Sequence, residues 1–554
     1  MNRIIGIRYG HDASSGLIQD GKIIADVAEE RFTRIKNDGS FPINAIDYCL
    51  QAGGITSEEL DAVVFPSDGY IPPPFFAFFD VPENVVNPQQ RGGVPQLPLY
   101  FKSWKLSSTC RVLTISHHLA HAASAYYTSG LGHAIPCLIV SMDGRGDNIS
   151  VAVWRGEKNR ITLLKQWDGG ASLGWFYANA TEALEWRHGS DEWKTMGLAP
   201  YGVPQPGALL GFHPEFKDGE LINKHDYGEA SRWLDHGVNH YHMRDAEPLR
   251  KIVSRIGREN FAAETQQVAE TQAEQIIIPW IKKEKLRNLC CAGGFFLNVK
   301  LNQKLWYSGA LDNHWIYPNP GDSGLSVGAA LYVYYAAHPD QQPEKLSTMY
   351  YGPEFSDAEI EGFLKERKLN YEKHNNISEI AAHLLAENKI VAWFQGRMEA
   401  GPRSLGNRSI LMSPLRSENK DIINACVKYR EAFRPFCPSL LYEKQDEYLV
   451  NAREEPFMIT SFEVKAERKC AIPAVVHVDG TARPQTVRRE TNPLYYDLIK
   501  MFGELTGQYA ILNTSFNVKG EPIICNPREA IRCFYDTGLD YLIMGHYILK
   551  KDVK

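Results

Sequence analysis

The sequence predicts an α/β (α+β) protein of two domains, the first of which is internally duplicated. Three observations lead to this prediction. At 554 residues the chain is longer than one hydrophobic core usually organises. A pattern of strand, glycine turn, strand, turn and strand occurs twice before residue 170. After residue 345 the composition shifts to loops rich in arginine, glycine and proline, so we place one domain at residues 1–345 and a second at residues 346–554.

The first copy of the pattern fills the first thirty residues. Apolar residues 4–7 predict a strand that ends at the break Gly10-His11-Asp12, and residues 15–18 predict a second, short strand. Asp20-Gly21 is a strong hairpin dipeptide and leads into a third strand at residues 22–27.

The second copy begins at residue 138. It predicts, in order, a strand at 138–142, a turn at 143–147, a strand at 149–154, a turn at 155–159 and a strand at 161–166. The stretch between the copies, residues 116–129, is helical in character. A repeated unit of this kind predicts a duplicated fold with a cleft between its halves.

Glycine turns recur at the ends of predicted strands. Gly144 lies in the turn of the second copy, and Gly293-Gly294 ends a short apolar strand, with Asn298 just beyond. A further turn at residues 319–324 runs into a helix of small residues at 326–335. Backbone N–H groups in such turns can face a phosphate, so Gly144, Gly293, Gly294 and Asn298 are predicted to bind nucleotide.

Four residues form a candidate metal site. His117 and His121 are one helical turn apart, a spacing that can present two imidazoles to one cation. Asp143 and Asp322 each lie in a glycine turn after an apolar segment, where they are free to point into the same cleft. Two imidazoles and two carboxylates suit Fe²⁺, Mn²⁺ or Zn²⁺. The alternative is a pair of histidines on a solvated helix face.

His11 and Asp12 occupy the first glycine turn. An imidazole titrates near neutral pH, so His11 is a candidate general base for an attacking hydroxyl. The alternative is a turn residue followed by a capping aspartate, and position alone does not separate the two interpretations.

The second domain carries clustered cations beside rigid turn residues. Residues 397–434 hold eight basic residues against four acidic ones, and the run 401–410 (GPRSLGNRSI) is followed by Lys428, Arg430 and Arg434. Arginines beside Gly, Pro, Asn and Ser are typical of anion sites, whereas a solvated basic face alternates with acids. We therefore expect phosphate binding here. The chain has no Gly-x-x-x-x-Gly-Lys-Ser/Thr loop, so a nucleotide is held in another way.

Composition argues against several classes of function. A net charge of −6 gives no global basic signature, so we expect no nucleic-acid partner and only a local cluster of arginines as an anion site. No run approaches about 18 apolar residues, and the first residues lack the features of a signal peptide, so we expect a cytoplasmic protein that spans no membrane. None of the ten cysteines forms a Cys-x-x-Cys pair, and we expect them to be reduced core residues.

These motifs, in this order, resemble the O-carbamoyltransferases, a family that includes nodulation protein U and the antibiotic carbamoyltransferases acting on aminoglycosides, cephems and ansamycins. The resemblance spans nearly the whole chain. The matching stretches are residues 10–14 (GHDAS), 29–34 (EERFTR), 117–122 (HHLAHA), 196–202 (MGLAPYG), 293–294 (GG), 401–410, 428–436, 477–485 and 513–517 (NTSFN).

The resemblance implies a fold and a reaction. The first domain is expected to be similar to the actin-like ATPase superfamily, and the second to the YrdC-like fold. The family is ATP-dependent: its second domain forms carbamoyl-adenylate from carbamoyl phosphate and ATP, and its first domain passes the carbamoyl group to a hydroxyl of a small, natural-product or sugar-containing acceptor. The expected partners are therefore carbamoyl phosphate, ATP with Mg²⁺ and this acceptor, in a monomer or homodimer.

The resemblance also implies residue roles. The four histidine and aspartate residues would bind a divalent metal, Fe²⁺ or another cation such as Mn²⁺, and His11, with Asp12 beside it, would be the base. Arg8 departs from the family pattern, in which a small or polar residue is expected. In the second domain, carbamoyl phosphate and nucleotide would be held by Arg403, Lys428, Arg434, Arg483, Asn513 and Ser515.

The acceptor is not identified by the sequence. Its pocket is expected in the least recognisable segments, residues 70–94 and 225–243. Aromatic residues in the first of these, such as Phe75 and Phe79, suggest a flat or partly apolar acceptor, or else simple packing.

Three rival functions stay open at this point. A tRNA threonylcarbamoyl-type transferase would need a basic surface, which the net charge of −6 does not offer. A hydrogenase-maturation carbamoyltransferase would need zinc fingers, and the chain has no Cys-x-x-Cys. A non-enzymatic nucleotide or sugar sensor on the actin-like fold would leave the arginine-rich second domain unexplained.

Overall fold

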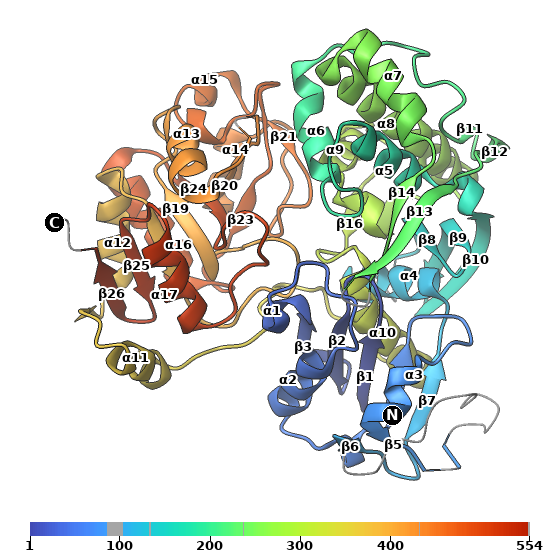
Figure 1. The fold of residues 1–554 in the computed structure, drawn as a ribbon, viewed down its shortest axis with the longest axis horizontal. Helices are drawn as coiled ribbons and strands as arrows, with labels where there is room; N and C mark the ends of the chain where they lie inside the picture. Colours follow the sequence, from blue (N-terminus) through green and yellow to red (C-terminus); the bar gives the residue numbers. More distant parts are fainter. Residues whose placement is uncertain (83, 86–102, 132–134, 236–237, 432, 552–554) are drawn as a thin grey trace. The chain divides into compact units, whose positions relative to one another are not determined.

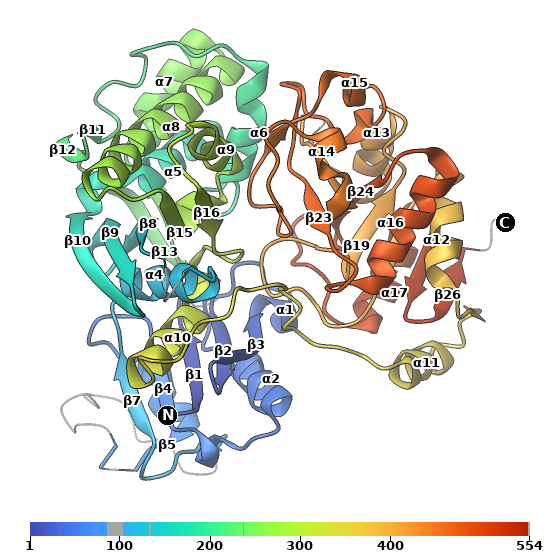
Figure 2. The same cartoon turned by 180° about the vertical axis from the view of Figure 1, so that it is seen from behind.

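The computed structural model describes residues 1–82, 84–85, 103–131, 135–235, 238–431 and 433–551. The chain is a mixed α/β protein that divides into two compact units. The first unit comprises residues 1–33 and 37–346, and the second comprises residues 34–36 and 347–554. Figures 1 and 2 show the elements of both units from opposite sides.

The first sheet of the first unit has the strand order β3-β2-β1-β4-β7. Strands β1, β2 and β3 pair antiparallel, and β4 and β7 continue from β1 in parallel. Their bounds are β1 (Arg3–Arg8), β2 (Ser14–Gln19), β3 (Lys22–Ala28), β4 (Ala62–Phe65) and β7 (Arg111–Thr114).

The second sheet repeats this arrangement with the order β10-β9-β8-β15-β16. Strands β8, β9 and β10 again pair antiparallel, and β15 and β16 again continue in parallel. The same order and the same directions in both sheets confirm the predicted duplication and the expected actin-like fold. The bounds are β8 (Cys137–Gly146), β9 (Ile149–Glu157), β10 (Arg160–Asp168), β15 (Asn288–Ala292) and β16 (Asn313–Ile316).

Two equivalent helices pack against each other in this unit. Helix α4 (His117–Thr128) follows the last strand of the first sheet, and α10 (Leu325–Ala337) follows the last strand of the second. A Cβ on Gly328 would lie 2.0 Å from the Ala120 carbonyl oxygen, so glycine is required where α10 crosses α4. A Cβ on Gly6 would likewise lie 1.9 Å from the Ser326 carbonyl oxygen, so β1 also approaches α10 closely.

The remaining elements of the first unit surround these two sheets. Helix α8 is the longest, at 26 residues, and its buried side includes Phe261, Ile277 and Trp280. The bounds are α1 (Glu30–Thr33), α2 (Ile43–Gly53), α3 (Pro73–Phe78), β5 (Phe79–Asp80), β6 (Trp104–Lys105), α5 (Leu173–Ala183), α6 (Glu192–Leu198), β11 (Glu215–Lys217), β12 (Glu220–Asn223), β13 (Glu229–Asp235), β14 (Val238–Met243), α7 (Ala246–Ile256), α8 (Arg258–Lys283) and α9 (Val299–Tyr307).

The second unit is built on an eight-stranded mixed sheet of order β17-β26-β25-β18-β19-β24-β20-β23. Helices α12 (Ile377–Ala386) and α16 (Pro493–Thr506) cover it through a core that includes Leu385, Trp393 and Leu498. The remaining bounds are α11 (Asp357–Glu366), β17 (Glu372–Lys373), β18 (Val391–Phe394), β19 (Arg408–Met412), α13 (Asn419–Ile423), β20 (Cys437–Leu441), α14 (Gln445–Tyr448), β21 (Phe462–Glu463), α15 (Ala466–Lys469), β22 (Thr481–Ala482), β23 (Gln485–Val487), β24 (Ala510–Ser515), α17 (Pro527–Asp536), β25 (Tyr541–Met544) and β26 (Tyr547–Lys550).

Two predicted turns were placed wrongly. Strand β8 continues through Gly146, and the chain reverses at Asp147 and Asn148, whose φ angles are 50° and 64°. The next reversal lies at Lys158 and Asn159, with φ of 49° and 58°. Two successive residues with positive φ form a two-residue hairpin turn, whose twist matches that of the flanking strands. Pairing therefore extends further than the glycines and aspartates suggested.

Two other features differ from expectation. Residues 34–36 group with the second unit, where the Arg34 guanidinium donates 2.7 Å hydrogen bonds to the carbonyl oxygens of Pro522 and Ile523. All ten cysteines are free and eight are buried as expected, but Cys426 and Cys470 are exposed. In the part of the chain that the structure describes, no helix has both the length and the apolar character needed to cross a bilayer.

Candidate functional sites: a histidine–aspartate cluster and a cation cluster

The structure brings His117, His121, Asp143 and Asp322 together, with one potential ligand atom from each lying within 4.8 Å of all the others. Nε2 of His117 lies 3.1 Å from Oδ2 of Asp143 and 3.4 Å from Oδ1 of Asp322. Nε2 of His121 lies 3.6 Å and 3.7 Å from the same two oxygens. Both histidines are buried and both are on α4, as the spacing predicted. We call these four residues the histidine–aspartate cluster.

His117 is positioned by two neighbours that the sequence did not single out. The Asp147 carboxylate accepts a 2.7 Å hydrogen bond from the His117 backbone N–H at the start of α4. Gly146 leaves room for the imidazole, because a Cβ there would lie 2.2 Å from the His117 ring. Both residues belong to the segment DGRGD (143–147), whose density of Gly and Asp was the available signal.

Asp143 lies near the end of β8, where the start of helix α5 holds the backbone of the strand. The Ser172 hydroxyl donates a 2.6 Å hydrogen bond to the Gly144 carbonyl and caps α5 by accepting from the Trp175 N–H at 3.0 Å. On its other side, the Gly294 N–H donates to Oδ1 of Asp143 at 3.3 Å. The predicted glycines 144 and 294 therefore surround Asp143.

Asp322 begins the short 3₁₀ turn (Asp322–Gly324) before α10 and pairs with Arg8. Nη2 of Arg8 lies 2.5 Å from Oδ2 of Asp322, and both side chains are less than one-fifth exposed. Arg8, the residue that departs from the family pattern, is thus in direct contact with the histidine–aspartate cluster.

The electrostatics of the cluster favour charged carboxylates. Burial alone would raise the pKa of Asp143, but His117 and His121 hold it well below its ordinary value. Burial would lower the pKa of His121, yet the two aspartates outweigh it and raise that pKa. Asp322 has a lowered pKa because Arg8 and His117 oppose the effect of burial.

The residues present fit a divalent cation. Nε2 of His121 is buried without a hydrogen-bond partner in the described residues, and it faces two carboxylate oxygens just beyond hydrogen-bonding distance. Two imidazole nitrogens and two carboxylate oxygens directed at one point form a donor set that suits Fe²⁺, Mn²⁺ or Zn²⁺.

His11 and Asp12 form a dyad beside this cluster. Nδ1 of His11 lies 3.2 Å from Oδ2 of Asp12, and Oδ1 of Asp12 accepts a 2.7 Å hydrogen bond from the Asn37 amide. The Asp12 carboxylate, opposed by burial, raises the pKa of His11 to about 9. A pKa of about 9 keeps His11 largely protonated at neutral pH, a state that the sequence did not anticipate for a base.

Asn298 is not brought to the cluster. Its side-chain oxygen Oδ1 caps α9 by accepting from the Leu301 N–H at 3.1 Å, and its side-chain amide exchanges hydrogen bonds with the Gln266 amide. Gly293 has φ of 101°, and a Cβ there would lie 2.1 Å from the Met142 carbonyl oxygen, so its glycine is required by close packing against β8. The nucleotide-binding roles of these residues stay predictions.

In the second unit the sheet topology gathers the predicted cations at one edge. Strands β19, β20 and β23 start at the edge where β24 ends, because β24 runs antiparallel to β19 and β20, and β23 runs parallel to β20. Cationic residues precede each of the three starting strands. They are Arg403 before β19, Arg430 and Arg434 before β20, and Arg483 before β23.

These four arginines and Lys428 form what we call the cation cluster. Burial, and then the proximity of Arg483, lowers the pKa of Arg403 to about 9. Burial, and then Arg434, lowers the pKa of Arg430 to about 9. Nη1 of Arg434 lies 3.3 Å from Oε2 of Glu431. Buried cations that lie close to further cations are stabilised by a bound anion, so this edge of the sheet is suited to phosphate.

Individual contacts refine the predicted roles. The Arg483 guanidinium directs Nε and Nη2 at the Cys437 sulfur, at 3.2 and 3.0 Å. The Lys428 ammonium group contacts the Ser515 carbonyl oxygen and hydroxyl, and two oxygens of Asn517 at 2.8 and 2.9 Å. With three donors and four oxygens around it, Lys428 orders the end of β24 in this structure.

Asn513 and Glu399 complete the interior of this site. The Asn513 amide N–H donates to the Ser404 carbonyl, the Ser439 hydroxyl and Gln485, at 3.0 to 3.3 Å, and its own oxygen is buried without a partner in the described residues. Glu399 accepts hydrogen bonds at 2.7 to 3.1 Å from three backbone N–H groups of the predicted anion loop, those of Leu405, Asn407 and Arg408. No local sequence pattern marks Glu399, because its role depends on the folded loop.

Two family models match most of this chain. The family model described as Carbamoyltransferase N-terminus matches residues 3–74 and 95–331, and that described as Carbamoyltransferase C-terminus matches residues 382–551. The chain belongs to the carbamoyltransferase family. The resemblance seen in the sequence is thereby confirmed, and the protein is a carbamoyltransferase enzyme.

Curated relatives support the same assignment. Nodulation protein NolNO of Sinorhizobium fredii is 34% identical over 558 residues, which cover 98% of this chain and 79% of the relative. Nodulation protein U of the same species is 36% identical over 571 residues, covering 96% of each chain. Among solved structures, component A of (R)-2-hydroxyglutaryl-CoA dehydratase from Acidaminococcus fermentans aligns with a TM-score of 0.36 and 14% identity, covering 61% of this chain and 100% of that one.

An arc of aromatic side chains leads from the Asp143 side of the histidine–aspartate cluster to His11. The Trp175 indole nitrogen lies against Gly144, where a Cβ would be 2.9 Å from it. Tyr241 stacks on Trp175 with a centroid distance of 5.7 Å, and His188 contacts Tyr241 at 4.9 Å. Next to His188, a Cβ on Gly189 would lie 3.5 Å from Nε2 of His11. The arc of Trp175, Tyr241 and His188 thus runs from the Asp143 side of the site to His11.

The two segments expected to line an acceptor pocket differ in their structure. Tyr227 and Tyr241 of residues 225–243 lie at the aromatic arc, and the Tyr227 hydroxyl is buried without a partner in the described residues. In residues 70–94, Phe75 and Phe79 are fully buried and pack on each other at 4.7 Å, which supports simple packing. Residues 83 and 86–94 lie outside the described residues.

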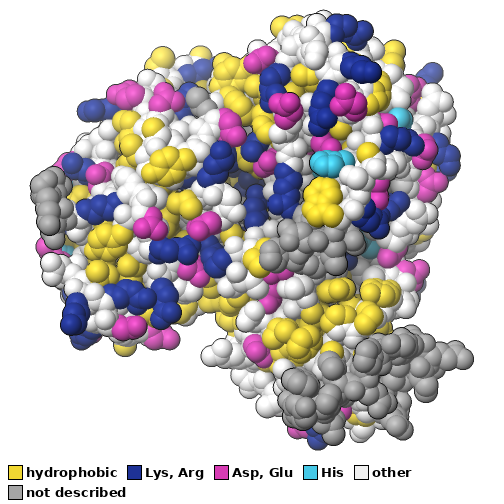
Figure 3. Space-filling model, in the orientation of Figure 1, with side chains coloured by type: hydrophobic (Ala, Val, Ile, Leu, Met, Phe, Trp, Pro, Cys, Tyr) yellow, Lys and Arg dark blue, Asp and Glu magenta, His cyan; other side chains and the backbone are white. Residues whose placement is uncertain are grey.

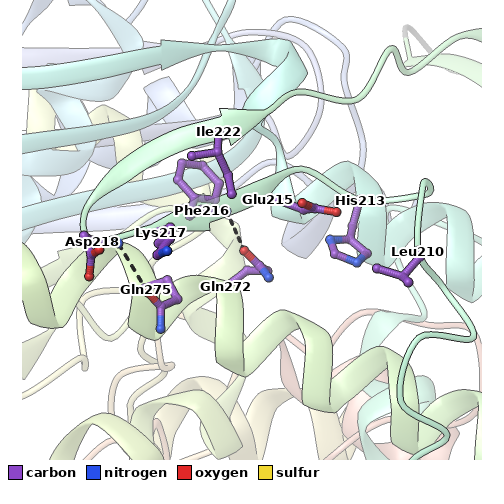
Figure 4. Close-up of a pocket in the computed structure, with 9 residues that line it drawn as sticks. All are labelled: Leu210, His213, Glu215, Phe216, Lys217, Asp218, Ile222, Gln272 and Gln275. Atoms are coloured by element: carbon purple, nitrogen blue, oxygen red, sulfur yellow. Dashed lines mark hydrogen bonds between the residues drawn. The ribbon is translucent and has the colours of Figure 1, made fainter.

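A separate hollow of about 510 Å³ lies between the β11–β12 hairpin and α8 (Figure 4). Gln272 and Gln275 of α8 accept hydrogen bonds from the backbone N–H groups of Phe216 and Asp218, at 2.7 and 3.3 Å, and so tie the hairpin to the helix. None of the nine residues that line it is a predicted site residue. On the face drawn in Figure 3, basic and acidic side chains are interspersed.

Proposed function

We propose that this carbamoyltransferase is ATP-dependent and works in two steps at two sites. The cation cluster of the second unit, for which we propose a YrdC-like fold, would form carbamoyl-adenylate. The histidine–aspartate cluster of the first unit would then transfer the carbamoyl group to a hydroxyl of a small-molecule acceptor. The observation that carries this proposal is the presence of two chemically different sites, one made of buried cations and one of imidazoles and carboxylates.

In the first step, carbamoyl phosphate, ATP and water would give carbamoyl-adenylate, inorganic phosphate and pyrophosphate. Water would first cleave carbamoyl phosphate into carbamate and inorganic phosphate. A carbamate oxygen would then attack the α-phosphorus of Mg²⁺-bound ATP, and pyrophosphate would leave. Arg403, Arg434 and Arg483 would neutralise the phosphates and align the two reactants. Lys428 would hold Ser515 and Asn517 in place. Asn513 would contact the nucleotide through its side-chain oxygen Oδ1, which has no hydrogen-bond partner in the described residues.

In the second step, His117, His121, Asp143 and Asp322 would hold Fe²⁺ or Mn²⁺. The bound cation would polarise the carbamoyl carbonyl, and its charge would lower the pKa of His11 toward neutrality. His11, oriented by Asp12, would accept the proton of the hydroxyl that attacks the carbamoyl carbon, and AMP would leave as the carbamoyl–phosphate bond breaks.

We further propose that the acceptor lies along the aromatic arc. Trp175, Tyr241 and His188 extend from Gly144 to Gly189, so a ring-shaped acceptor packed on them would have a hydroxyl within reach of His11. Aromatic faces provide apolar contact area, and the indole N–H and imidazole provide hydrogen bonds that fix orientation.

The experiment for the first step is carbamoyl-phosphate-dependent exchange of labelled pyrophosphate into ATP. Replacing Arg434 by alanine removes a cation that is 17% exposed in its side chain. We expect the exchange rate to fall by roughly 10²–10⁴, the range for loss of a charge-assisted phosphate contact in an enclosed site. Arg287→Ala is the matched control, because Arg287 is exposed and pairs with Asp312 in the first unit. An Arg434 variant within about threefold of wild type would refute the role, since that is under ~1 kcal/mol.

A further inference from the structure

Arg8 lies at the end of β1 with its guanidinium against the histidine–aspartate cluster. Nη2 is 2.5 Å from Oδ2 of Asp322, and Nε is buried without a hydrogen-bond partner in the described residues. The side chain is 17% exposed. A partly buried arginine that uses one donor on a carboxylate and leaves another unused has capacity for a second anionic partner.

The duplicated fold gives this position a counterpart. Strand β1 lies between β2 and β4 in the first sheet, and β8 lies between β9 and β15 in the second. Arg8 is the last residue of β1, while Asp143 lies near the end of β8. The two copies therefore direct opposite charges at one site: a carboxylate that can bind a cation, and a guanidinium that cannot.

Asp322 divides its two oxygens between these functions. Oδ1 lies 3.4 and 3.7 Å from the Nε2 atoms of His117 and His121, whereas Oδ2 is held by Arg8. A cation can bind Oδ1 while Arg8 keeps Oδ2. With neutral histidines, two carboxylates and one arginine, the site has a net charge of −1 when empty and +1 with a divalent cation.

We propose that Arg8 is a positioning residue that sets the charge of this site. It fixes Asp322 with Oδ1 toward the histidines. Its positive charge lowers the affinity of the site for the cation and gives the site with bound cation a net positive charge. The loaded site then binds a phosphate monoester, such as the leaving group of an adenylate, in preference to a neutral group. This inference rests on the proposed cation at the cluster.

The first test is Mn²⁺ binding to the full chain by equilibrium dialysis with metal analysis. Arg8→Met keeps the length of the side chain and removes its charge, and Arg8→Lys keeps the charge. We expect Arg8→Met to bind Mn²⁺ at least about tenfold more tightly than wild type, because a cation a few ångströms away is gone. Arg8→Lys should stay within about threefold. Weaker binding by Arg8→Met, with its circular dichroism spectrum unchanged, would show a purely structural role and overturn the proposal.

The second test is the enhancement of ³¹P relaxation of AMP by Mn²⁺ bound to the protein. The double variant His117→Ala/His121→Ala, which lacks the cluster ligands, supplies the background from AMP bound elsewhere. We expect Arg8→Met to bind AMP about tenfold or more weakly than wild type, although it binds Mn²⁺ more tightly. Arg8→Lys should retain most of the wild-type affinity for AMP. Equal AMP affinity in wild type and Arg8→Met would overturn the proposal. If wild type binds no more Mn²⁺ than the double variant, the proposed cation site fails, and the role of Arg8 fails with it.

Discussion

Replacing Gly146 by alanine places a methyl carbon in steric conflict with the ring of His117. A Cβ on Gly146 would lie 2.2 Å from Cδ2 and Cγ of that ring, whereas ordinary contact begins at about 3.4 Å. The His117 side chain is only 3% exposed, so the ring has no solvent into which to move. The imidazole must shift by about 1 Å or more, and its Nε2 atom leaves the position that faces Asp143 and Asp322.

A shift of this size is large against the ±0.2 Å within which metal–ligand distances are fixed. Disturbing a residue that orients a metal ligand typically costs about 10- to 100-fold in affinity, and here a ligand itself is displaced. We expect Gly146→Ala to bind Mn²⁺ or Fe²⁺ about 100-fold more weakly than wild type, as measured by equilibrium dialysis and metal analysis.

Gly321→Ala is the matched control for this experiment. Gly321 directly precedes Asp322, and a Cβ there would meet no atom within 4 Å. It should bind metal as wild type does. Wild-type affinity in Gly146→Ala would refute the reasoning, because His117 could then move without consequence for the cation. Equal losses in both variants would point to general disruption of the fold.

Two further predictions concern the acceptor and the base. Tyr241→Leu should raise the KM about tenfold for any hydroxyl acceptor that the wild type carbamoylates, and it should leave pyrophosphate exchange unchanged. Tyr241→Phe keeps the ring and should behave as wild type. Equal losses of transfer and exchange in Tyr241→Leu would contradict the role of the arc as an acceptor surface. Asp12→Asn should lower the pKa of His11 from about 9 toward its ordinary 6.5, because the Asp12 charge is the largest cause of the shift. NMR titration of the imidazole in metal-free protein measures this pKa. Because the pKa of His11 is raised in the folded state, the protonated His11 stabilises the fold fully below pH 6.5, and this stabilisation is lost as the pH rises through 9. The unfolding free energies of wild type and Asp12→Asn should therefore converge above pH 9. An unchanged titration midpoint of His11 in Asp12→Asn would show that Asp12 is not the cause of the shift.

The fold was predictable where local pattern decides it. Alternating strands and acidic glycine turns near residues 10 and 143 indicated the duplication, and the sheets confirm it. The turns themselves were misplaced, because positive φ at Asp147 and Asn148 completes a tight hairpin that glycine content does not reveal. Residues 34–36 could not be assigned to the second unit from sequence, since the contacts of Arg34 are with residues almost five hundred positions away.

The residues that would bind a ligand at the candidate sites could be predicted from the sequence, but the residues that position them could not. The spacing of His117 and His121 and the aspartates in glycine turns pointed to four residues that the structure does place together. The contact of Arg8 with Asp322 spans 314 positions, and the hydrogen bonds of Glu399 depend on how its loop folds back. Such partners are set by tertiary packing, and no local pattern encodes them.

The central claim is that adenylate formation and carbamoyl transfer belong to different sites, and His11→Ala and His117→Ala test it most directly. In each variant, carbamoyl-phosphate-dependent pyrophosphate exchange and formation of carbamoylated product are measured on the same preparation. We expect exchange to stay within about threefold of wild type while product formation falls by roughly 10²–10⁴, with AMP still released as the stranded intermediate hydrolyses. Loss of exchange and product together, in variants whose circular dichroism spectra match wild type, would contradict the division of the two steps between the two units.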